Sequence, residues 1–260
     1  MRHAMTLVVG LAVLMVASGV RADWDKGDPY KMHQPQLPDP KGWDIAFGPT
    51  TGSQLLLADD WLCTQTGAVS DIHFWISFKG DEWSKDPADV GPLWVGLWSN
   101  QPGSKLPPKP SRPLDRLWAR SFKHYEYTFR QDGQGDQGFY NPETGEYTGK
   151  TDHKLIYQIN ITDIPNPFIQ EEGKVYWLSL QMDMHPDDGT IGWKTSSEQW
   201  ADDAVWTSWP YGDKPIPWHP IQDPRTGESL DLAFVITPEP ATLALLGLGA
   251  AALVARRRRK

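Results

Sequence analysis

The chain has 260 residues, among them 14 tryptophans and a single cysteine, and its formal net charge at neutral pH is −8. Residues 23–237 contain 18 basic and 32 acidic side chains, which gives this segment a net charge of −14. So large an excess of negative charge argues against nucleic acid or an anionic membrane surface as a partner. The length of the segment suits one large all-β domain or two small ones, and we favour one domain because no linker-like stretch divides it.

Residues 1–22 have the layout of a secretory signal peptide. Arg2 precedes an apolar run over residues 5–17, and small residues then lead to Ala22. This order of charge, apolar core and small residue predicts a signal helix that is cleaved after Ala22. We therefore expect the mature chain to be exported and to begin at Asp23.

The next segment, residues 23–53, is rich in proline and glycine and has no helical period, which predicts an extended N-terminal arm. Residues 54–237 instead contain many windows in which apolar and polar residues alternate with the two-residue period of a strand. The clearest windows are 71–78, 93–98, 154–161, 174–182 and 230–236, and shorter ones cover 116–122, 124–130, 190–195 and 204–209. No window of similar length has the pattern of an amphipathic helix. We therefore predict one all-β domain over residues 54–237, a β-sandwich of jelly-roll type.

Tryptophan is the main peculiarity of the composition. Four tryptophans fall on strand faces opposite the main apolar stripes, namely Trp75, Trp94, Trp98 and Trp177. Flat aromatic rings can stack on sugars, so an exposed patch of these side chains would form a carbohydrate-binding face. The alternative is that the tryptophan-rich segment 206–220 folds over this face and buries it. We favour the buried arrangement, because large exposed apolar patches are rare on free monomers.

Adjacent acidic residues occur at 59–60, 171–172, 187–188 and 202–203. A glycoside hydrolase needs two carboxylates on either side of a cleft, but neighbouring residues of a strand point to opposite faces. We therefore expect these pairs in turns and caps. Several aspartates with turn-like spacing are candidate oxygen ligands for a structural calcium ion. They are Asp132, Asp136, Asp183, Asp187 and Asp188.

The usual catalytic and metal-binding patterns are absent from the sequence. The histidines lack the spacing of a zinc site, and there is neither a nucleophile elbow nor a phosphate-binding glycine loop. We expect the lone Cys63 to be a small buried residue. The sequence therefore predicts no catalytic residue and no cofactor other than any structural calcium.

The last 23 residues combine three features in a fixed order. Pro238, Glu239 and Pro240 come first, an uncharged stretch over residues 241–255 follows, and a basic cluster ends the chain. The cluster over 256–260 consists of Arg256, Arg257, Arg258, Arg259 and a final lysine. Fifteen helical residues fall short of the roughly 20 that usually span a bilayer. The predicted transmembrane helix is therefore short, and its basic end is expected on the cytoplasmic side.

This C-terminal arrangement, residues 238–260, resembles the PEP-CTERM sorting signal of Gram-negative bacteria. The resemblance implies that a membrane exosortase acts at the Pro-Glu-Pro site. The protein would then be anchored in the inner membrane, transiently or permanently, and delivered to the cell surface or extracellular matrix. Proteins with this signal typically accompany exopolysaccharide production. An ordinary C-terminal membrane anchor is the alternative.

The body also resembles, over residues 55–237, an uncharacterised family of exported bacterial domains that carry PEP-CTERM tails. The similar stretches are, in order, DDW, HFWISF, YNPETGEYTG, YWLSLQM, GWKTSSEQWADDAVW and SLDLAFVIT. That family has no established chemistry, so the resemblance implies no catalytic residue.

The sequence thus predicts a non-enzymatic surface or matrix protein with a structural or interaction role associated with exopolysaccharide. Its expected partners are an exosortase, the membrane through the C-terminal segment, and extracellular polysaccharide. A carbohydrate-binding module that uses the tryptophan face is the first alternative, and a polysaccharide-acting hydrolase is the second.

Overall fold

The computed structural model describes residues 23–50, 53–83, 86–106, 108–184, 189–209 and 216–238. Two short 3-10 turns, η1 (Lys79–Asp81) and η2 (Pro87–Asp89), accompany the strands. The prediction of an all-β sandwich is confirmed. Within the described ranges no helix is long and apolar enough to cross a membrane. The predicted signal helix and C-terminal membrane segment lie outside these ranges.

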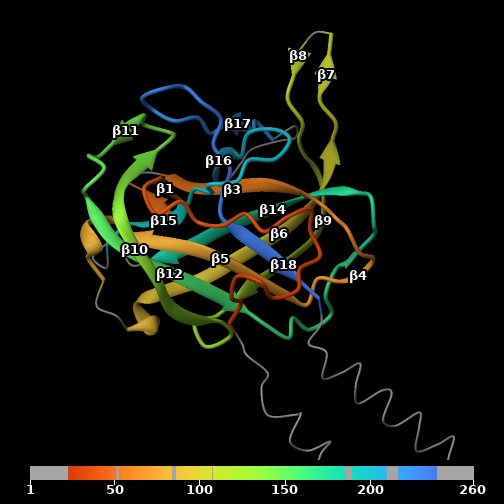
Figure 1. The fold of residues 1–260 in the computed structure, drawn as a ribbon, viewed down its shortest axis with the longest axis horizontal. Coiled ribbons are helices and arrows are strands. Elements are labelled where there is room, and N and C mark those ends of the chain that lie inside the picture. Colours follow the sequence, from red (N-terminus) through yellow and green to blue (C-terminus); the bar gives the residue numbers. More distant parts are fainter. Residues whose placement is uncertain are drawn as a thin grey trace, which may run out of the picture.

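Sheet 1 has the strand order β1-β15-β5-β12-β10-β11, and β18 also pairs with β5. Its strands are β1 (Trp43–Ala46), β5 (Asp71–Phe78), β10 (Thr128–Asn141), β11 (Glu146–Tyr147), β12 (His153–Ile161), β15 (Ile191–Lys194) and β18 (Phe234–Thr237). A parallel pairing joins β1, at one end of this path, to β10, the last strand but one at the other end (Figure 1). The strands β1, β15, β5, β12 and β10 therefore close into a ring.

Glycine makes the closing contact of the ring possible. Trp43 of β1 lies opposite Gly138 of β10. A Cβ atom at Gly138 would lie 2.5 Å from the Cζ3 atom of the Trp43 ring, so any larger residue would push the two strands apart.

Sheet 2 has the order β17-β16-β3-β14-β6-β9, and β2 pairs with β3. Its strands are β2 (Pro49–Thr50), β3 (Ser53–Leu62), β6 (Val90–Gln101), β9 (Arg112–Phe122), β14 (Val175–Met184), β16 (Val205–Trp209) and β17 (His219–Pro220). Two small pairs complete the fold, β4 (Gly67–Ala68) with β13 (Ile169–Gln170), and β7 (Ser104–Lys105) with β8 (Pro108–Lys109). The β7–β8 hairpin projects from the body at the top of Figure 1.

The hydrophobic core joins the two sheets through the alternating residues that the sequence predicts. Phe74 and Ile76 of β5 are buried in the same cluster as Val95 and Leu97 of β6. Because successive side chains of a strand point to opposite faces, the intervening residues of β5 lie on the other side of sheet 1. That side is the interior of the ring.

Two segments differ from their predicted structure. The expected arm, residues 23–53, contains β1 and β2, and the side chains of Trp43 and Phe47 belong to the core. The sequence predicts a turn for the glycine-rich segment around Asp132 and Asp136, but this segment lies in the long strand β10. The ladder from β10 to β12 has two register shifts, which break the two-residue period and hide the strand in the sequence.

Candidate functional site

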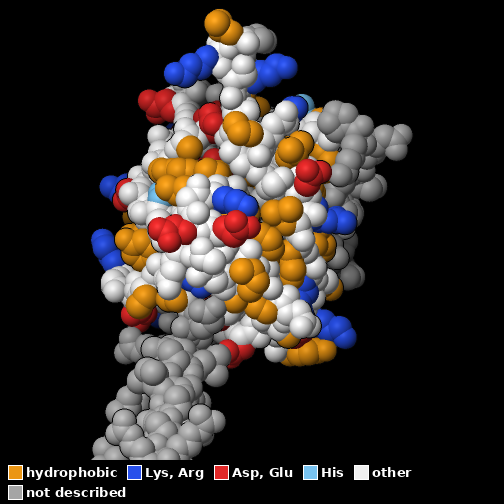
Figure 2. Space-filling view, turned by 90° about the vertical axis from the view of Figure 1, so that its right-hand side faces the viewer, with side chains coloured by type: hydrophobic (Ala, Val, Ile, Leu, Met, Phe, Trp, Pro, Cys, Tyr) orange, Lys and Arg blue, Asp and Glu red, His pale blue; other side chains and the backbone are white. Residues whose placement is uncertain are grey.

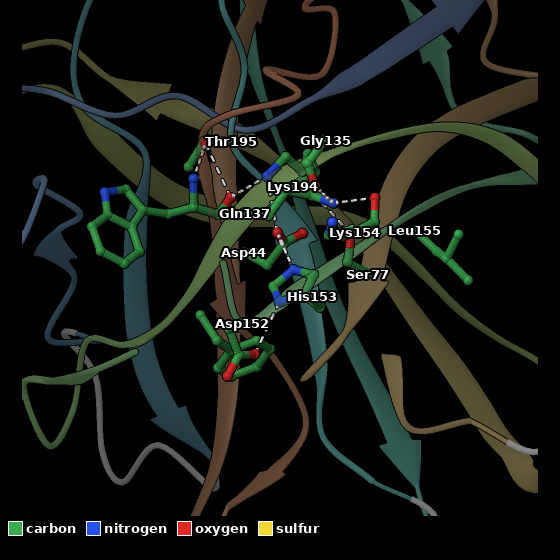
Figure 3. Close-up of polar contacts among 12 residues, drawn as sticks. Asp44, Ser77, Gly135, Gln137, Asp152, His153, Lys154, Leu155, Lys194 and Thr195 are labelled. Atoms are coloured by element: carbon green, nitrogen blue, oxygen red, sulfur yellow. Dashed lines mark hydrogen bonds and ion pairs between the residues drawn. The ribbon is translucent and has the colours of Figure 1, made fainter. Parts of the chain in front are cut away.

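The interior of the ring contains a layer of polar side chains, one from each of the five ring strands. They are Asp44 (β1), Ser77 (β5), Gln137 (β10), His153 (β12) and Lys194 (β15). Each is at most 1% exposed. Figure 3 shows these side chains converging from different strands. We call these five residues the ring layer.

Asp44 is the centre of the ring layer. Its Oδ2 atom accepts hydrogen bonds from Lys194 Nζ at 2.9 Å and His153 Nε2 at 2.8 Å. β1 and β12 are not neighbours in the ring, so the contact with His153 crosses its interior. Burial alone would raise the pKa of Asp44, but the Lys194 charge and the His153 hydrogen bond outweigh it and lower the pKa. Asp44 is therefore a buried carboxylate that is held ionised by its partners.

His153 lies between two carboxylates. Its Nδ1 atom is 3.0 Å from Asp152 Oδ2, and its Nε2 atom faces Asp44. Only the protonated ring can donate from both nitrogens. Burial would lower the pKa of His153, but its bonds to Asp44 and Asp152 outweigh that effect and raise the pKa. Below the raised pKa of His153, two anions, Asp44 and Asp152, thus balance two cations, His153 and Lys194.

Gln137 and Ser77 are the two uncharged members of the ring layer. Ser77 Oγ donates to Gln137 Oε1 at 3.2 Å, and Gln137 Nε2 donates to the Lys154 carbonyl at 2.8 Å. Gly192 lies opposite Ser77, and a Cβ atom there would come within 2.7 Å of the Asp44 Cβ atom. The layer is therefore tightly packed, and its hydrogen bonds fix the ring strands relative to one another.

Trp24 and Asp25, near the start of the described chain, contact a second part of the ring interior, beside the ring layer. Trp75 Nε1 donates to Asp132 Oδ2 at 2.7 Å, and Arg130 bridges the carboxylates of Asp25 and Asp132, each at 2.7 Å. The Trp24 ring packs edge-on against Trp75, with 6.1 Å between ring centroids. The start of the predicted mature chain thus packs against the ring.

A second buried polar cluster lies outside the ring layer, and we call it the acidic cluster. It consists of Asp59 and Asp60 of β3, Asp231, and the neighbouring Asp202 and Asp203. Asp59 Oδ2 accepts hydrogen bonds from Gln36 Nε2 at 3.1 Å and from the Leu232 amide at 2.6 Å.

The Asp60 carboxylate differs from that of Asp59 in having no hydrogen-bond partner among the described residues. It is 1% exposed, and among the described residues neither of its carboxylate oxygens accepts a hydrogen bond. Burial, reinforced by the charges of Asp231 and Asp202, raises the pKa of Asp60 to about 9. Burial also raises the pKa of Asp231 to about 7. The acidic cluster therefore holds protons at neutral pH.

The predicted turn and cap roles are correct for only part of these acids. Glu171 and Glu172 lie at a turn, in which the Lys174 amide donates to the Glu171 carbonyl at 3.2 Å. Asp202 Oδ2 and Asp203 Oδ2 instead accept long-range bonds, from the Ser111 amide at 2.9 Å and from Gln222 Nε2 at 3.3 Å. Asp59 and Asp60, in contrast, are buried in the middle of a long strand. The turn prediction is wrong for that pair.

The four tryptophans proposed as a carbohydrate-binding face do not form an exposed patch. Trp75, Trp98 and Trp177 are at most 1% exposed, and Trp94 is half-buried. Trp98 and Trp177 belong to a small cluster that includes Ile216, with Trp218 packed against it. Ile216 and Trp218, from the segment 206–220, therefore cover Trp98 and Trp177, as in the arrangement favoured from the sequence. Trp75 lies on the other sheet and packs against Trp24.

The indole nitrogens of the covered tryptophans also have partners. Trp98 Nε1 donates to Ser179 Oγ at 2.6 Å, and Trp177 Nε1 donates to Asn100 Oδ1 at 2.9 Å. Figure 2 shows one face of the molecule, with the β7–β8 hairpin at its top, on which hydrophobic and charged side chains are interspersed. The exposed large hydrophobic side chains of the described chain are leucine, isoleucine and tyrosine, with Leu106 at 90% the most exposed.

The two calcium candidates that the structure describes, Asp132 and Asp136, do not form a metal site. Asp132 is bound to Arg130 and Trp75, and Asp136 lies 3.7 Å from Lys154 Nζ. The Asp183 side chain, Asp187 and Asp188 lie outside the described residues. Within the part of the chain that the structure describes, no group of three or more acidic, histidine or cysteine side chains could hold a metal ion.

Cys63 is buried, as the sequence predicts. Its Sγ atom donates to the Gln65 carbonyl at 3.2 Å, and burial raises the pKa of the thiol. A buried thiol with a raised pKa is a poor nucleophile.

The predicted sorting segment begins where the last strand ends. In β18, Thr237 pairs with Asp71 of β5, and Pro238 follows as a half-buried residue. Glu239, Pro240 and the basic cluster lie outside the described residues, as does the predicted cleavage site before Asp23. The sorting segment is thus joined directly to a strand of sheet 1.

The ring layer could not be identified from the sequence. Asp44, His153 and Lys194 are single residues that are far apart along the chain, and no motif connects them. The sequence gives one indication of them: Asp44 and Lys194 are charged residues that each follow a tryptophan in a short apolar stretch.

Two family models together match residues 32–259, which is nearly the whole chain. Residues 32–237 match a domain of unknown function, DUF7901, and residues 237–259 match the PEP-CTERM protein-sorting motif. Neither the curated proteins nor the solved structures contain a match. The DUF7901 match ends at Thr237, where β18 ends and the sorting motif begins. The chain therefore belongs to the DUF7901 family and ends in a PEP-CTERM sorting motif, which marks it as an exported, exosortase-processed protein.

Proposed function

We propose that this protein is a component of the cell surface or extracellular matrix, with a structural or interaction role beside exopolysaccharide and no catalytic role. The observation that carries the proposal is the sorting motif at residues 237–259, which directly follows β18. Cleavage in that motif would release the sandwich as one intact body. Sorting to the surface would then place the folded domain beside extracellular polysaccharide.

The two buried polar clusters support the non-catalytic part of the proposal. A catalytic carboxylate or histidine has to reach its substrate. Asp44, His153 and Lys194 are at most 1% exposed, and Asp60 is 1% exposed. Their arrangement serves the packing of the strands, and the buried Cys63 thiol is equally inaccessible.

The sorting part of the proposal is tested in the native host with two forms of the chain. One is the full chain, and the other ends at Thr237. We expect the full chain in the surface or matrix fraction and the truncated chain in the soluble fractions. An identical distribution of the two forms would contradict sorting through the C-terminal segment.

The non-catalytic role is tested on the purified domain, residues 23–237. Incubation with exopolysaccharide from the host should leave the number of reducing ends unchanged. A time-dependent increase that scales with protein concentration would establish a hydrolase and overturn this part of the proposal.

A further inference from the structure

Trp43 forms the centre of a group of aromatic and cationic side chains at the β1–β10 junction. Lys150 Nζ lies 3.8 Å from the centroid of the Trp43 ring, and the guanidinium carbon of Arg225 lies 5.2 Å from it. The Tyr147 ring meets Trp43 edge-on at 5.7 Å, and Tyr140 lies 6.4 Å away. Trp43 lies on β1, Tyr140 and Tyr147 lie on the β10–β11 hairpin, and Lys150 and Arg225 lie in two loops. Figure 1 shows β1, β10 and β11 at the same side of the molecule.

The carboxylates near this group, Asp223 and Asp39, act on Lys150 without a direct ion pair among the described residues. Within the described residues neither Lys150 nor Arg225 joins an ion pair, whereas Arg120 pairs with Glu126 at 2.8 Å and Arg130 pairs with Asp25 at 2.7 Å. Lys150 Nζ donates to the Lys41 carbonyl at 3.1 Å, which leaves other donors of the ammonium unused. The Arg225 side chain donates to no described residue. Among the described residues, Lys150 and Arg225 therefore keep hydrogen-bond donors available to a ligand.

Asp223 fixes this group of side chains in place through hydrogen bonds, but it forms no direct ion pair with Lys150 or Arg225 among the described residues. Asp223 Oδ2 accepts from Trp43 Nε1 at 2.7 Å. Its Oδ1 atom accepts from the amides of Arg225 at 2.7 Å and Thr226 at 3.2 Å. Asp223 thereby fixes both the Trp43 ring and the loop that carries Arg225, so the cations are positioned before any ligand binds.

The group is also accessible. Tyr147 is 48% exposed, Arg225 is exposed, and Tyr140 and Lys150 are half-buried. An exposed aromatic ring can cover the apolar face of a sugar, and an arginine beside it can bind a carboxylate through two parallel hydrogen bonds. A partly desolvated ammonium adds an attraction that is stronger than it would be in bulk water.

The geometry points to a binding site for a uronic-acid unit of an acidic polysaccharide, in which Tyr147 contacts the sugar ring while Lys150 and Arg225 bind its carboxylate. This inference rests on the proposed function, since it names the partner of the exported domain. It uses none of the four tryptophans considered from the sequence.

The test is binding of the purified domain, residues 23–237, to oligogalacturonate by calorimetry at low salt. Lys150→Gln and Arg225→Gln should each weaken binding about tenfold, since each removes a charge-assisted hydrogen bond. Tyr147→Ala should weaken binding, whereas Tyr147→Phe should leave it nearly unchanged. Lys109→Gln, on the exposed β8 strand, is the matched charge control and should have no effect.

Methyl-esterified oligogalacturonate has the same sugar rings but lacks their charge, so it should bind much more weakly than the acid form. Added salt should weaken the binding of the acid form, because salt screens the attraction between charges. Equal affinity for the acid and the ester, or for wild type and Arg225→Gln, would overturn the inference. Thermal unfolding of each variant checks that it is folded. These measurements do not depend on the C-terminal segment, so the site can fail while sorting holds, and sorting can fail while the site holds.

Discussion

The ring layer and the acidic cluster are both buried polar groups, but their charges are neutralised in opposite ways. In the ring layer, Asp44 is matched by Lys194 and His153 at hydrogen-bond distance. In the acidic cluster, Asp60 has no partner among the described residues and takes up a proton instead. A buried carboxylate remains charged only where cations accompany it. The two regions should therefore respond differently to substitution and to pH.

The largest expected effect comes from removing a cation from the ring layer. Lys194→Met leaves the Asp44 carboxylate buried with one cationic partner fewer. Breaking a buried ion pair in this way costs about 3–5 kcal/mol of unfolding free energy. Urea denaturation of the domain measures this loss of unfolding free energy. Lys150→Met, at a half-buried surface position, is the control and should cost less than about 1 kcal/mol. A loss of that smaller size for Lys194→Met would show that the ring layer does not stabilise the fold.

The acidic cluster should make the domain less stable as pH rises. The pKa of Asp60 is about 9 in the folded chain and lies near 4 when the residue is exposed. Between these values the folded state binds a proton that the unfolded state lacks, so stability falls by about 1.4 kcal/mol per pH unit for this group.

The Asp60→Asn variant isolates that contribution. An amide does not titrate, so the free energy of unfolding should fall less steeply between pH 6 and pH 8 than in the wild type. Asp136→Asn, at an exposed position, should keep the wild-type slope. Parallel pH profiles for wild type and Asp60→Asn would mean that Asp60 is ionised in the folded protein.

His153 should contribute a smaller pH effect of the same sign. Its pKa is raised in the folded chain, so its contribution is complete below the unfolded value near 6.5 and is lost as pH rises through the folded pKa. His153→Gln should cost about 2 kcal/mol at pH 6 because it removes hydrogen bonds between charged groups. The cost should shrink at higher pH. NMR titration of the imidazole in the wild type measures the pKa directly, and a value below 6.5 would contradict the charge balance of the ring layer.

The smallest effect is expected for the covered tryptophans, whose polar contacts are neutral. Trp98→Phe removes the hydrogen bond to Ser179 and should cost about 1 kcal/mol, the usual value for a neutral hydrogen bond, plus the packing of the lost ring. Tyr125→Phe, at a side chain that is 69% exposed, should leave stability unchanged. Thermal unfolding compares the two, and equal stability of both variants would mean that the cover over Trp98 is loose.

The local alternation of residues identified the central strands. The windows at 71–78, 93–98, 154–161 and 174–182 correspond to β5, β6, β12 and β14, because one face of each strand is buried against the core. The alternation failed for β1, which has only four residues, and for β10, where bulges interrupt it. A short or irregular strand gives no periodic signal.

The polar sites depended on contacts that no local pattern contains. The parallel β1–β10 pairing closes the ring, and only then do Asp44, His153 and Lys194 meet. Likewise, Lys150 and Arg225 approach Trp43 only in the folded chain. The C-terminal motif, in contrast, was identified completely from the sequence, because a sorting signal is read as a linear segment.

The most direct test of the account is the intact mass of the protein recovered from the extracellular fraction of its native host. If sorting proceeds through the C-terminal motif, this chain begins at Asp23, ends close to Pro238 and contains the whole sandwich. A membrane-bound chain that retains Lys260 would contradict the account and would identify the C-terminal segment as a permanent anchor.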